Sequence, residues 1–289
     1  RCRRQRAQLF NGILTMAEGV NTASLPNTSQ SRLGLIAHVM AGPFAMGLLG
    51  WLLFLLGWQW ASSAGIAPPR LFPSPIAVLI SLQELLLEKG FASDIFASIK
   101  RILSSFLIAV TIALPLGLLM GAVRRIDWLL SPLAGAFRYL PAPAFIPLLL
   151  MWLGTGEAQK LALLVIGVVF FLVIMVADTT RQVPKVFVET AKTLGVPPYR
   201  IVWSVIFRYS LPAYIDLFRQ MLAVSWTYLV IAEIVAATDG IGAMMMRAKR
   251  FVHVDDIMAG ILVIGVLGLL FDALFRALHR LAFPYLHSR

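Results

Sequence analysis

Few residues of this chain could carry out a chemical reaction. Its histidines, His38, His253, His279 and His287, lie far apart in the sequence, and none belongs to an HExxH pair or another metal-ligand spacing. The lone Cys2 excludes an internal disulfide and a CxxC pair. No GxxxxGK[ST] loop, which would hold the phosphates of a nucleotide, occurs in the 289 residues. The sequence therefore predicts a chain that is not an enzyme, holds no cofactor or metal of its own, and does not hydrolyse ATP.

Ionisable residues within apolar runs are better candidates for function, because a charge in hydrocarbon is costly and usually faces a cavity or a partner. Arg219, Trp226 and Glu233 are spaced by seven residues and Asp216 precedes them, so the four fall near one helical face. We expect this stripe to face a translocation pathway or a subunit interface. The alternative is that Asp216 and Arg219 simply neutralise each other near the cytoplasmic end of the helix.

A second candidate is Arg138, which stands beside Tyr139 and just ahead of a proline cluster. A guanidinium group offers a planar, bidentate fork to oxyanions, so Arg138 is the preferred contact for a translocated anion. The alternative is an anchor whose long side chain extends to the inner membrane interface.

The composition determines the elements that must position these residues. Hydrophobic residues make up 59% of the chain, charged residues 13%, and the mean hydropathy is +0.83, which is too apolar for a soluble domain. The net charge of +11 comes from cations in the gaps between apolar runs, which indicates membrane topology and not nucleic-acid binding. Six runs approach the roughly 20 residues that a helix needs to cross a bilayer. They are residues 35–60, 102–123, 129–153, 161–177, 213–237 and 257–278.

Prolines modify this pattern at two places. Pro141, Pro143 and Pro147 predict a broken or kinked third span, which membrane bundles tolerate. Pro73 and Pro75 stand at the head of an apolar run at helical spacing, which we interpret as an amphipathic helix at the outer interface. A plain packing helix is the alternative.

The Lys and Arg residues of the connections favour cytoplasmic N- and C-termini, because the inner connections then carry most of the cations. In this orientation the cluster of Arg247, Lys249 and Arg250 would lie in an outer connection, which argues against it. We interpret it as a contact with an acidic partner or an anionic solute, or as merely solvated charge. Residues 1–33 show no cleavable signal peptide and are expected to form a disordered cytoplasmic tail.

A polar, basic segment, residues 189–212, stands between two apolar runs and is expected to face the cytoplasm and a partner protein. Glu189 would suit the positive end of a helix dipole, and Gly195 would permit a chain reversal. An ordinary loop between helices is the alternative.

This segment resembles the EAA loop of bacterial ABC-importer permeases, in which a short helix docks into the ATPase subunit. Its Glu189-Thr190-Ala191, Gly195 and Leu211-Pro212 are similar to that motif, and similarity to the nitrate, sulfonate, taurine and bicarbonate branch extends over residues 35–284. Further motifs that carry the resemblance are Leu71-Phe72-Pro73-Ser74-Pro75, Arg138-Tyr139-Leu140-Pro141, Trp152-Leu153-Gly154, Ala232-Glu233 and Gly240-Ile241-Gly242.

The resemblance implies an all-α, polytopic membrane bundle of about six helices with the MetI-like fold of type I importers, spanning residues 34–289 with a coupling loop at 181–212. It implies an inner-membrane permease that works with ATPase subunits holding ATP and Mg, a second permease copy, a solute-binding protein and membrane lipid. The residues implied to dock onto the ATPase are Glu189, Thr190, Ala191, Gly195, Val196, Tyr199 and Arg200.

Two positions depart from the family pattern. Thr190 stands where a second alanine is expected, and Phe207-Arg208 replaces an earlier Leu-Pro, which leaves the end of the docking helix open. The implied function is import of a small anion, such as a sulfonate, taurine, nitrate or bicarbonate, by alternating access. One alternative is import of a thiamine precursor or flavin-like heterocycle. Another is a secondary transporter driven by an ion gradient, which would show paired broken helices.

Overall fold

The computed structural model describes residues 43–65, 68 and 70–286, so the predicted tail at 1–33 lies outside the described part. The chain divides into two units, Arg1–Trp60 and Ala61–Arg289. Helix α3 (Pro43–Ser63) belongs almost wholly to the first unit, and its residues Ala45–Ser63 are long and apolar enough to cross a membrane. It accounts for the described part of the first predicted span.

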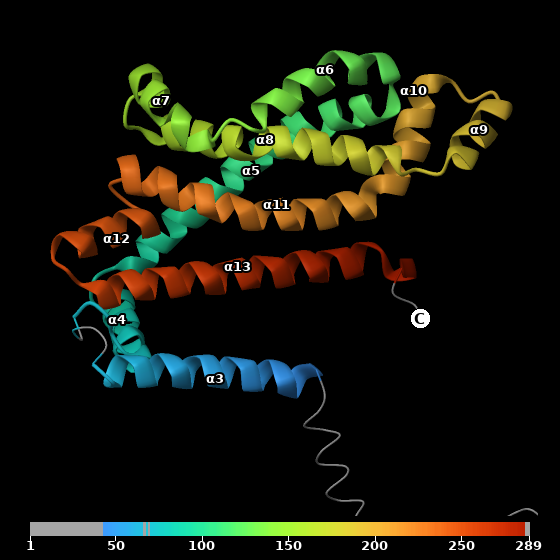
Figure 1. The fold of residues 1–289 in the computed structure, drawn as a ribbon. Coiled ribbons are helices and arrows are strands. Elements are labelled where there is room, and N and C mark those ends of the chain that lie inside the picture. Colours follow the sequence, from blue (N-terminus) through green and yellow to red (C-terminus); the bar gives the residue numbers. More distant parts are fainter. Residues whose placement is uncertain (1–42, 66–67, 69, 287–289) are drawn as a thin grey trace, which may run out of the picture. The chain divides into compact units, whose positions relative to one another are not determined.

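The second unit is built from helices, and no strand occurs in the described ranges (Figure 1). Its longer helices are α4 (Pro75–Leu87), α5 (Phe91–Ala122), α6 (Arg124–Phe137), α7 (Ile146–Leu153), α8 (Glu157–Arg181), α9 (Lys185–Thr193), α11 (Phe207–Ala236), α12 (Ile241–Arg250) and α13 (Val254–Ala282). The short elements are η1 (Ala142–Phe145), α10 (Pro198–Arg200), η2 (Ile201–Ile206) and η3 (Pro284–Leu286). The predicted all-α class is confirmed.

In the described ranges, five helices are long and apolar enough to cross a membrane, or up to six if a bent pair of helices counts as one span. The pair consists of α6 and the residues Ala142–Leu153, which meet at 83°. The break follows Pro141, whose ring cannot continue a helix. The prediction of about six spans is confirmed, and the predicted break lies at Pro141.

The spans begin earlier than the apolar runs suggest. Helix α5 starts at Phe91 and includes Asp94, Ser98 and Arg101, all of which are buried. These polar side chains find partners on other helices, so they do not have to remain outside the apolar span.

Small residues allow the central helices α5 and α8 to pack closely. A Cβ on Gly117 would lie 2.6 Å from the carbonyl oxygen of Val173, and one on Gly121 would lie 2.3 Å from Cβ of Thr180. Membrane helices depend on such close approach because lipid gives them no hydrophobic force toward each other. The glycines therefore set the distance between α5 and α8.

Replacing Gly117 with alanine is expected to destabilise the protein by about 1–3 kcal/mol, because an added methyl group overpacks a close helix contact. The measurement is thermal unfolding of the purified chain in detergent. Gly135→Ala on α6 is the control, since nothing lies within 4 Å of its Cβ position and alanine favours helix. Equal unfolding temperatures for the two variants would contradict the packing argument.

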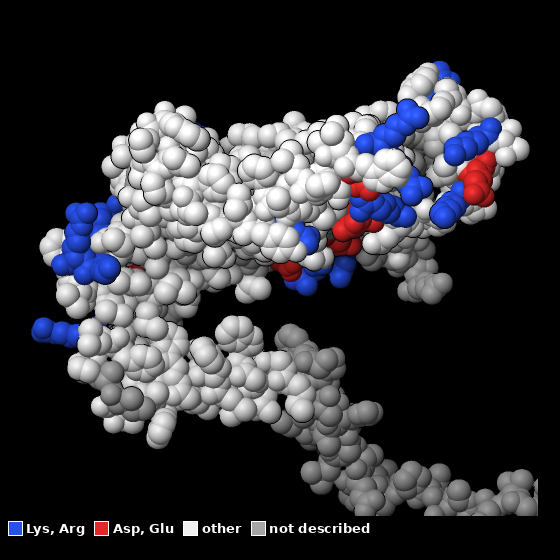
Figure 2. Space-filling view, turned by 45° about the horizontal axis from the view of Figure 1, so that its top comes forward, with Lys and Arg blue, Asp and Glu red and all other residues white. Residues whose placement is uncertain are grey.

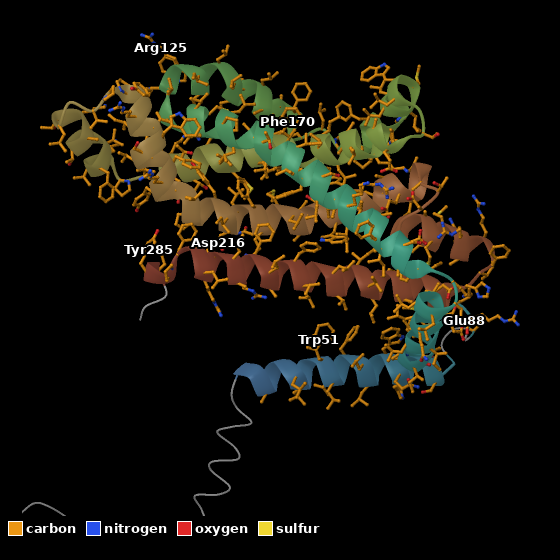
Figure 3. All side chains as sticks on the ribbon, turned by 180° about the vertical axis from the view of Figure 1, so that it is seen from behind. Trp51, Glu88, Arg125, Phe170, Asp216 and Tyr285 are labelled. Carbon is orange, nitrogen blue, oxygen red and sulfur yellow. The ribbon has the colours of Figure 1, made fainter. Side chains whose placement is uncertain are left out.

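The second unit has two polar ends. The α9 end contains α9, α10, the start of α11 and the C-termini of α5, α8 and α13; the α12 end contains α4, α7, α12 and the N-termini of α5, α8 and α13 (Figure 1). Charged side chains gather at both ends, a further group of red and blue atoms lies between them, and the rest of this stretch is uncharged (Figure 2). Arg125 lies at the α9 end and Glu88 at the α12 end (Figure 3). This grouping matches the predicted inner and outer connections, and which end faces the cytoplasm stays a prediction.

Helix α4 lies at the α12 end and packs against α13. Ser74 caps it by accepting a hydrogen bond from the Ala77 N–H, and Pro75 occupies its first turn. Val78 and Leu85 are buried, whereas Leu79 on another face is exposed. One face of α4 thus serves packing, and its place at a membrane interface stays a prediction.

Candidate functional site

The segment from α9 to α10 is a helix, a tight reversal and a second helix. Helix α9 begins after Pro184 and ends at Thr193. The Val196 N–H then donates to the Ala191 carbonyl at 3.0 Å, and the Gly195 N–H donates to the Lys192 carbonyl at 2.9 Å. These two bonds form a Schellman turn, which requires a left-handed residue, and Gly195 has φ +73°.

The predicted docking residues 189–200 therefore do not lie on one continuous helix, because α9 ends at Thr193 and α10 begins at Pro198. Pro197 is extended and Pro198 starts α10, which continues through a π-helix, η2, into α11. Glu189 also lies in the middle of α9, not near its start, because Pro184 places the helix start at Lys185. The favourable dipole position proposed for Glu189 does not apply.

The predicted docking residues separate by exposure. Glu189, Thr190, Gly195, Tyr199 and Arg200 are exposed. Val196 is half-buried, and Ala191 is buried in a cluster with Leu118, Val183, Ile201 and Ile206. Ala191 thus fixes α9 to the bundle, and the exposed residues form the surface that a partner could touch.

Two surface residues of this segment escaped the sequence reasoning. Leu194 is 76% exposed at the tip of the turn, and Phe187 is 47% exposed and packs against the ring of Tyr209. Together with Tyr199, whose ring lies under the Arg200 guanidinium at 5.8 Å, they present apolar area amid charge. Such a rimmed apolar patch is typical of a protein-binding surface. Both residues could have been found in the sequence as apolar residues within a polar connection.

Arg138 lies at the C-terminal end of α6, directly before the break in the third span. Its guanidinium stacks 5.0 Å from the centre of the Tyr139 ring and donates to the Tyr139 hydroxyl at 3.0 Å. No carboxylate pairs with it among the residues that the structure describes. In the described ranges, no carboxylate therefore neutralises this guanidinium, and its role as an anion contact stays a prediction.

The predicted stripe on α11 divides between two neighbouring helices. Arg219 contacts Asp272 of α13 at 3.3 Å and Asp216 of its own helix at 3.7 Å. Trp226 packs against Phe271 of α13 with ring centres 6.0 Å apart. Glu233 instead turns to α5. The predicted ion pair between Asp216 and Arg219 is present, and Arg219 also pairs with Asp272.

Glu233 belongs to an ionic cluster centred on Arg101 of α5, in which Arg101 and Glu233 are buried and the carboxylates of Glu157 and Asp239 are exposed. Arg101 is 3% exposed and grips Glu157 of α8 with two hydrogen bonds, of 2.9 and 2.7 Å. It also pairs with Glu233, and its other terminal nitrogen reaches Asp239 at 3.2 Å. Lys160 adds a bond of 2.7 Å to Glu157. Of this cluster, the sequence analysis identified only Glu233. Arg101 could have been found in the sequence as a charged residue directly before the second apolar run.

The same cluster holds the start of α12. Glu233 accepts the Ser98 hydroxyl at 2.7 Å and the Gly242 N–H at 2.8 Å. Asp94 accepts the Gly240 N–H at 2.8 Å. A Cβ on Gly240 would lie 2.5 Å from a Glu233 carboxylate oxygen, so only glycine fits there. The cluster fastens α5, α8, α11 and α12 together at this end.

Next to the cluster, a cleft of 270 Å³ opens at the α12 end. Its charged lining forms two pairs, Lys89 with Asp256 at 3.1 Å and Arg247 with Asp94. The cleft is therefore balanced in charge. No group of three or more potential metal ligands occurs in the part of the chain that the structure describes.

Comparison with known proteins identifies the setting of these features. The family model of the binding-protein-dependent transport system inner membrane component matches residues 113–284. The taurine transport system permease protein TauC of Escherichia coli is 30% identical over 79% of this chain and 85% of its own length. A putative aliphatic sulfonates transport permease protein of Bacillus subtilis is 29% identical over 77% of this chain and 81% of its own, and the bicarbonate transport system permease protein CmpB of Synechococcus elongatus is 29% identical over 78% and 84%. A chain of the MetNI methionine ABC transporter, solved in inward-facing conformations, superposes with a TM-score of 0.61 at 19% identity over 66% of this chain and 94% of that one. The likeness to that structure confirms the predicted MetI-type fold.

Proposed function

This chain belongs to the family of binding-protein-dependent transport system inner membrane components, and we propose from this premise that it is the permease of an ATP-driven importer of a small anion. The protein itself is a permease subunit of an ABC transporter. The solute, the energy source and the alternating-access mechanism are the proposed parts.

The single observation that carries the proposal is the exposed α9–α10 segment. Its Schellman turn fixes Leu194 and Tyr199 on the surface, and buried Ala191 fixes α9 to the bundle. A short helix held this rigidly can transmit a rigid-body movement of an ATPase partner into α11, with which α10 is continuous through η2. ATP and Mg would be held by that partner.

The anionic solute is proposed from two sources. The relatives are named for taurine, aliphatic sulfonates and bicarbonate, which all carry an anionic group. In this chain Arg138 offers a guanidinium without a carboxylate partner in the described ranges, at the break of the third span. Binding there would be weak, because an importer must release its solute.

The proposed assembly contains two copies of this permease, two ATPase subunits and an extracytoplasmic binding protein, all at the inner membrane. The α9 end would face the cytoplasm with both termini, since it carries Arg124, Arg125, Arg276 and Arg280. The α12 end, with Arg247, would then face the binding protein. Lipid would surround the apolar outer face.

The experiment is uptake into proteoliposomes that contain the chain with its co-purified ATPase and binding protein. We expect entry of labelled taurine, another sulfonate or bicarbonate only when ATP and Mg reach the ATPase side. Collapse of proton and sodium gradients by ionophores should leave uptake unchanged. Uptake that follows an ion gradient without ATP would overturn the proposal in favour of a secondary transporter.

Replacing Arg138 with glutamine is expected to lower anion uptake by roughly tenfold or more, since a charged hydrogen bond contributes about 1.5–3 kcal/mol. Assembly and unfolding temperature should not change, because within the described ranges the guanidinium donates a hydrogen bond only to the Tyr139 hydroxyl. Arg124→Gln is the matched control, as Arg124 stacks over Trp128 at 4.9 Å on the same helix. Unchanged uptake of every anion would leave Arg138 as an interfacial anchor.

A further inference from the structure

A small pocket of 220 Å³ lies between α11 and α13, separate from the docking segment and from Arg138. Every side chain that lines it is ionisable: Asp216, Arg219, Arg276, His279 and Arg280. Asp216 lies at the same end of the second unit as Tyr285, which follows α13 (Figure 3). We call this group of five residues the basic pocket.

The basic pocket has more positive than negative charge. Asp272 of α13, which is not one of the five lining residues, pairs with Arg219 at 3.3 Å and with Arg276. Asp216 lies 3.7 Å from Arg219 and 3.6 Å from His279. Arg219 and Arg276 thus pair with two carboxylates, and the third guanidinium, that of Arg280, pairs with no carboxylate in the described ranges. An anion would find one excess positive charge here before His279 is counted.

Arg219 also carries one hydrogen-bond donor that has no acceptor in the described ranges. The Nε atom of Arg219 is buried and has no partner among the residues described. A buried donor without an acceptor is unfavourable, and a guanidinium recognises phosphate oxygens through several N–H groups at once. A phosphate in the pocket would supply acceptors to Arg219, Arg276 and Arg280.

An apolar stripe on α13 leads to the two outer arginines of the pocket. Val266, Leu269 and Ala273 precede Arg276 and Arg280 at steps of three or four residues, so the five share one helical face. All five are exposed, Val266 at 55% and Leu269 at 64%. A soluble anion would leave this apolar stripe uncovered, whereas the acyl chains of a lipid would cover it.

We propose that the basic pocket binds the phosphate of an anionic phospholipid whose acyl chains lie along the exposed face of α13. Basic pockets between membrane helices commonly hold acidic head groups. Phosphate oxygens would accept from Arg219, Arg276 and Arg280, and the lipid would join α11 to α13 at the end where α11 continues from the docking segment.

The test is native mass spectrometry of the purified chain in mild detergent, titrated with phosphatidylglycerol and, separately, with phosphatidylcholine. We expect retention of phosphatidylglycerol in preference. Arg280→Gln should weaken that binding about fivefold and Arg276→Gln/Arg280→Gln more, as each arginine near a lipid surface contributes a similar factor. Arg280→Gln removes no ion pair found in the described ranges, so its fold should persist, and circular dichroism checks this.

The matched control is Lys249→Gln/Arg250→Gln on α12, which removes two exposed cations from the opposite end. This variant should retain phosphatidylglycerol like the original chain. Equal retention by the Arg276 and Arg280 variants would overturn the proposal. Displacement of the lipid by millimolar inorganic phosphate would instead assign the pocket to a soluble anion. If the arginine variants lose the dimer of this chain but retain the lipid, the pocket contacts a second copy of the chain.

Discussion

Replacing Gly195 with leucine is expected to weaken the interaction of this permease with its ATPase, and to lower ATP-dependent uptake, about tenfold or more. Gly195 adopts φ +73° in the Schellman turn, where a side chain costs about 1–2 kcal/mol. A shift of that size changes an equilibrium about tenfold, so the turn would open and Leu194 and Tyr199 would leave their positions. The measurement is recovery of the ATPase subunit and its activity with the tagged chain in a gentle detergent pull-down.

Two variants separate docking from general strain. Gly90→Leu has the same backbone strain, with φ +66° and no atom within 4 Å, but lies at the α12 end and should retain the ATPase. Gly195→Asn should retain most of the interaction, because asparagine tolerates the left-handed conformation. If Gly195→Leu purifies with a fully active ATPase and transports normally, the segment does not dock.

Replacing Arg101 with methionine is expected to destabilise the chain by about 3–5 kcal/mol, because it leaves a buried carboxylate without its counter-ion. Glu233, 1% exposed, would keep only the Ser98 hydroxyl and the Gly242 N–H as donors. The unfolding temperature in detergent should fall by roughly 10 °C. Arg101→Lys should also be destabilising, since an ammonium group cannot replace the two-pronged grip on Glu157.

Arg181→Met provides the matched control at the opposite end. Arg181 also bridges two carboxylates, Asp127 and Asp178, but its side chain is 39% exposed, so its loss should cost no more than about 1 kcal/mol. Adding Glu233→Gln to Arg101→Met should restore part of the lost stability by removing the buried charge. Equal unfolding temperatures for Arg101→Met and Arg181→Met would show that the cluster does not fasten the helices.

The docking segment was foreseen in part. Gly195 was expected to permit a chain reversal, and its left-handed turn confirms that expectation, because glycine adopts positive φ at no steric cost. The sequence did not show that Ala191 is buried or that Pro198 begins a second helix continuous with α11. Burial depends on which helices come to lie beneath α9, and no local pattern contains that information.

The sequence by itself determined the all-α class, about six spans, the broken third span and the exposed polar segment after α8. These features follow from the length of apolar runs and from Pro141 and Gly195, whose effects on the backbone are local. Only the tertiary structure determined which partners the charged residues of the helices have. Arg101 meets Glu233, which is 132 positions away, and the stripe of Arg219, Trp226 and Glu233 divides between α13 and α5. The energy of a buried charge depends on its neighbours in space, and the packing of the helices determines which residues those neighbours are.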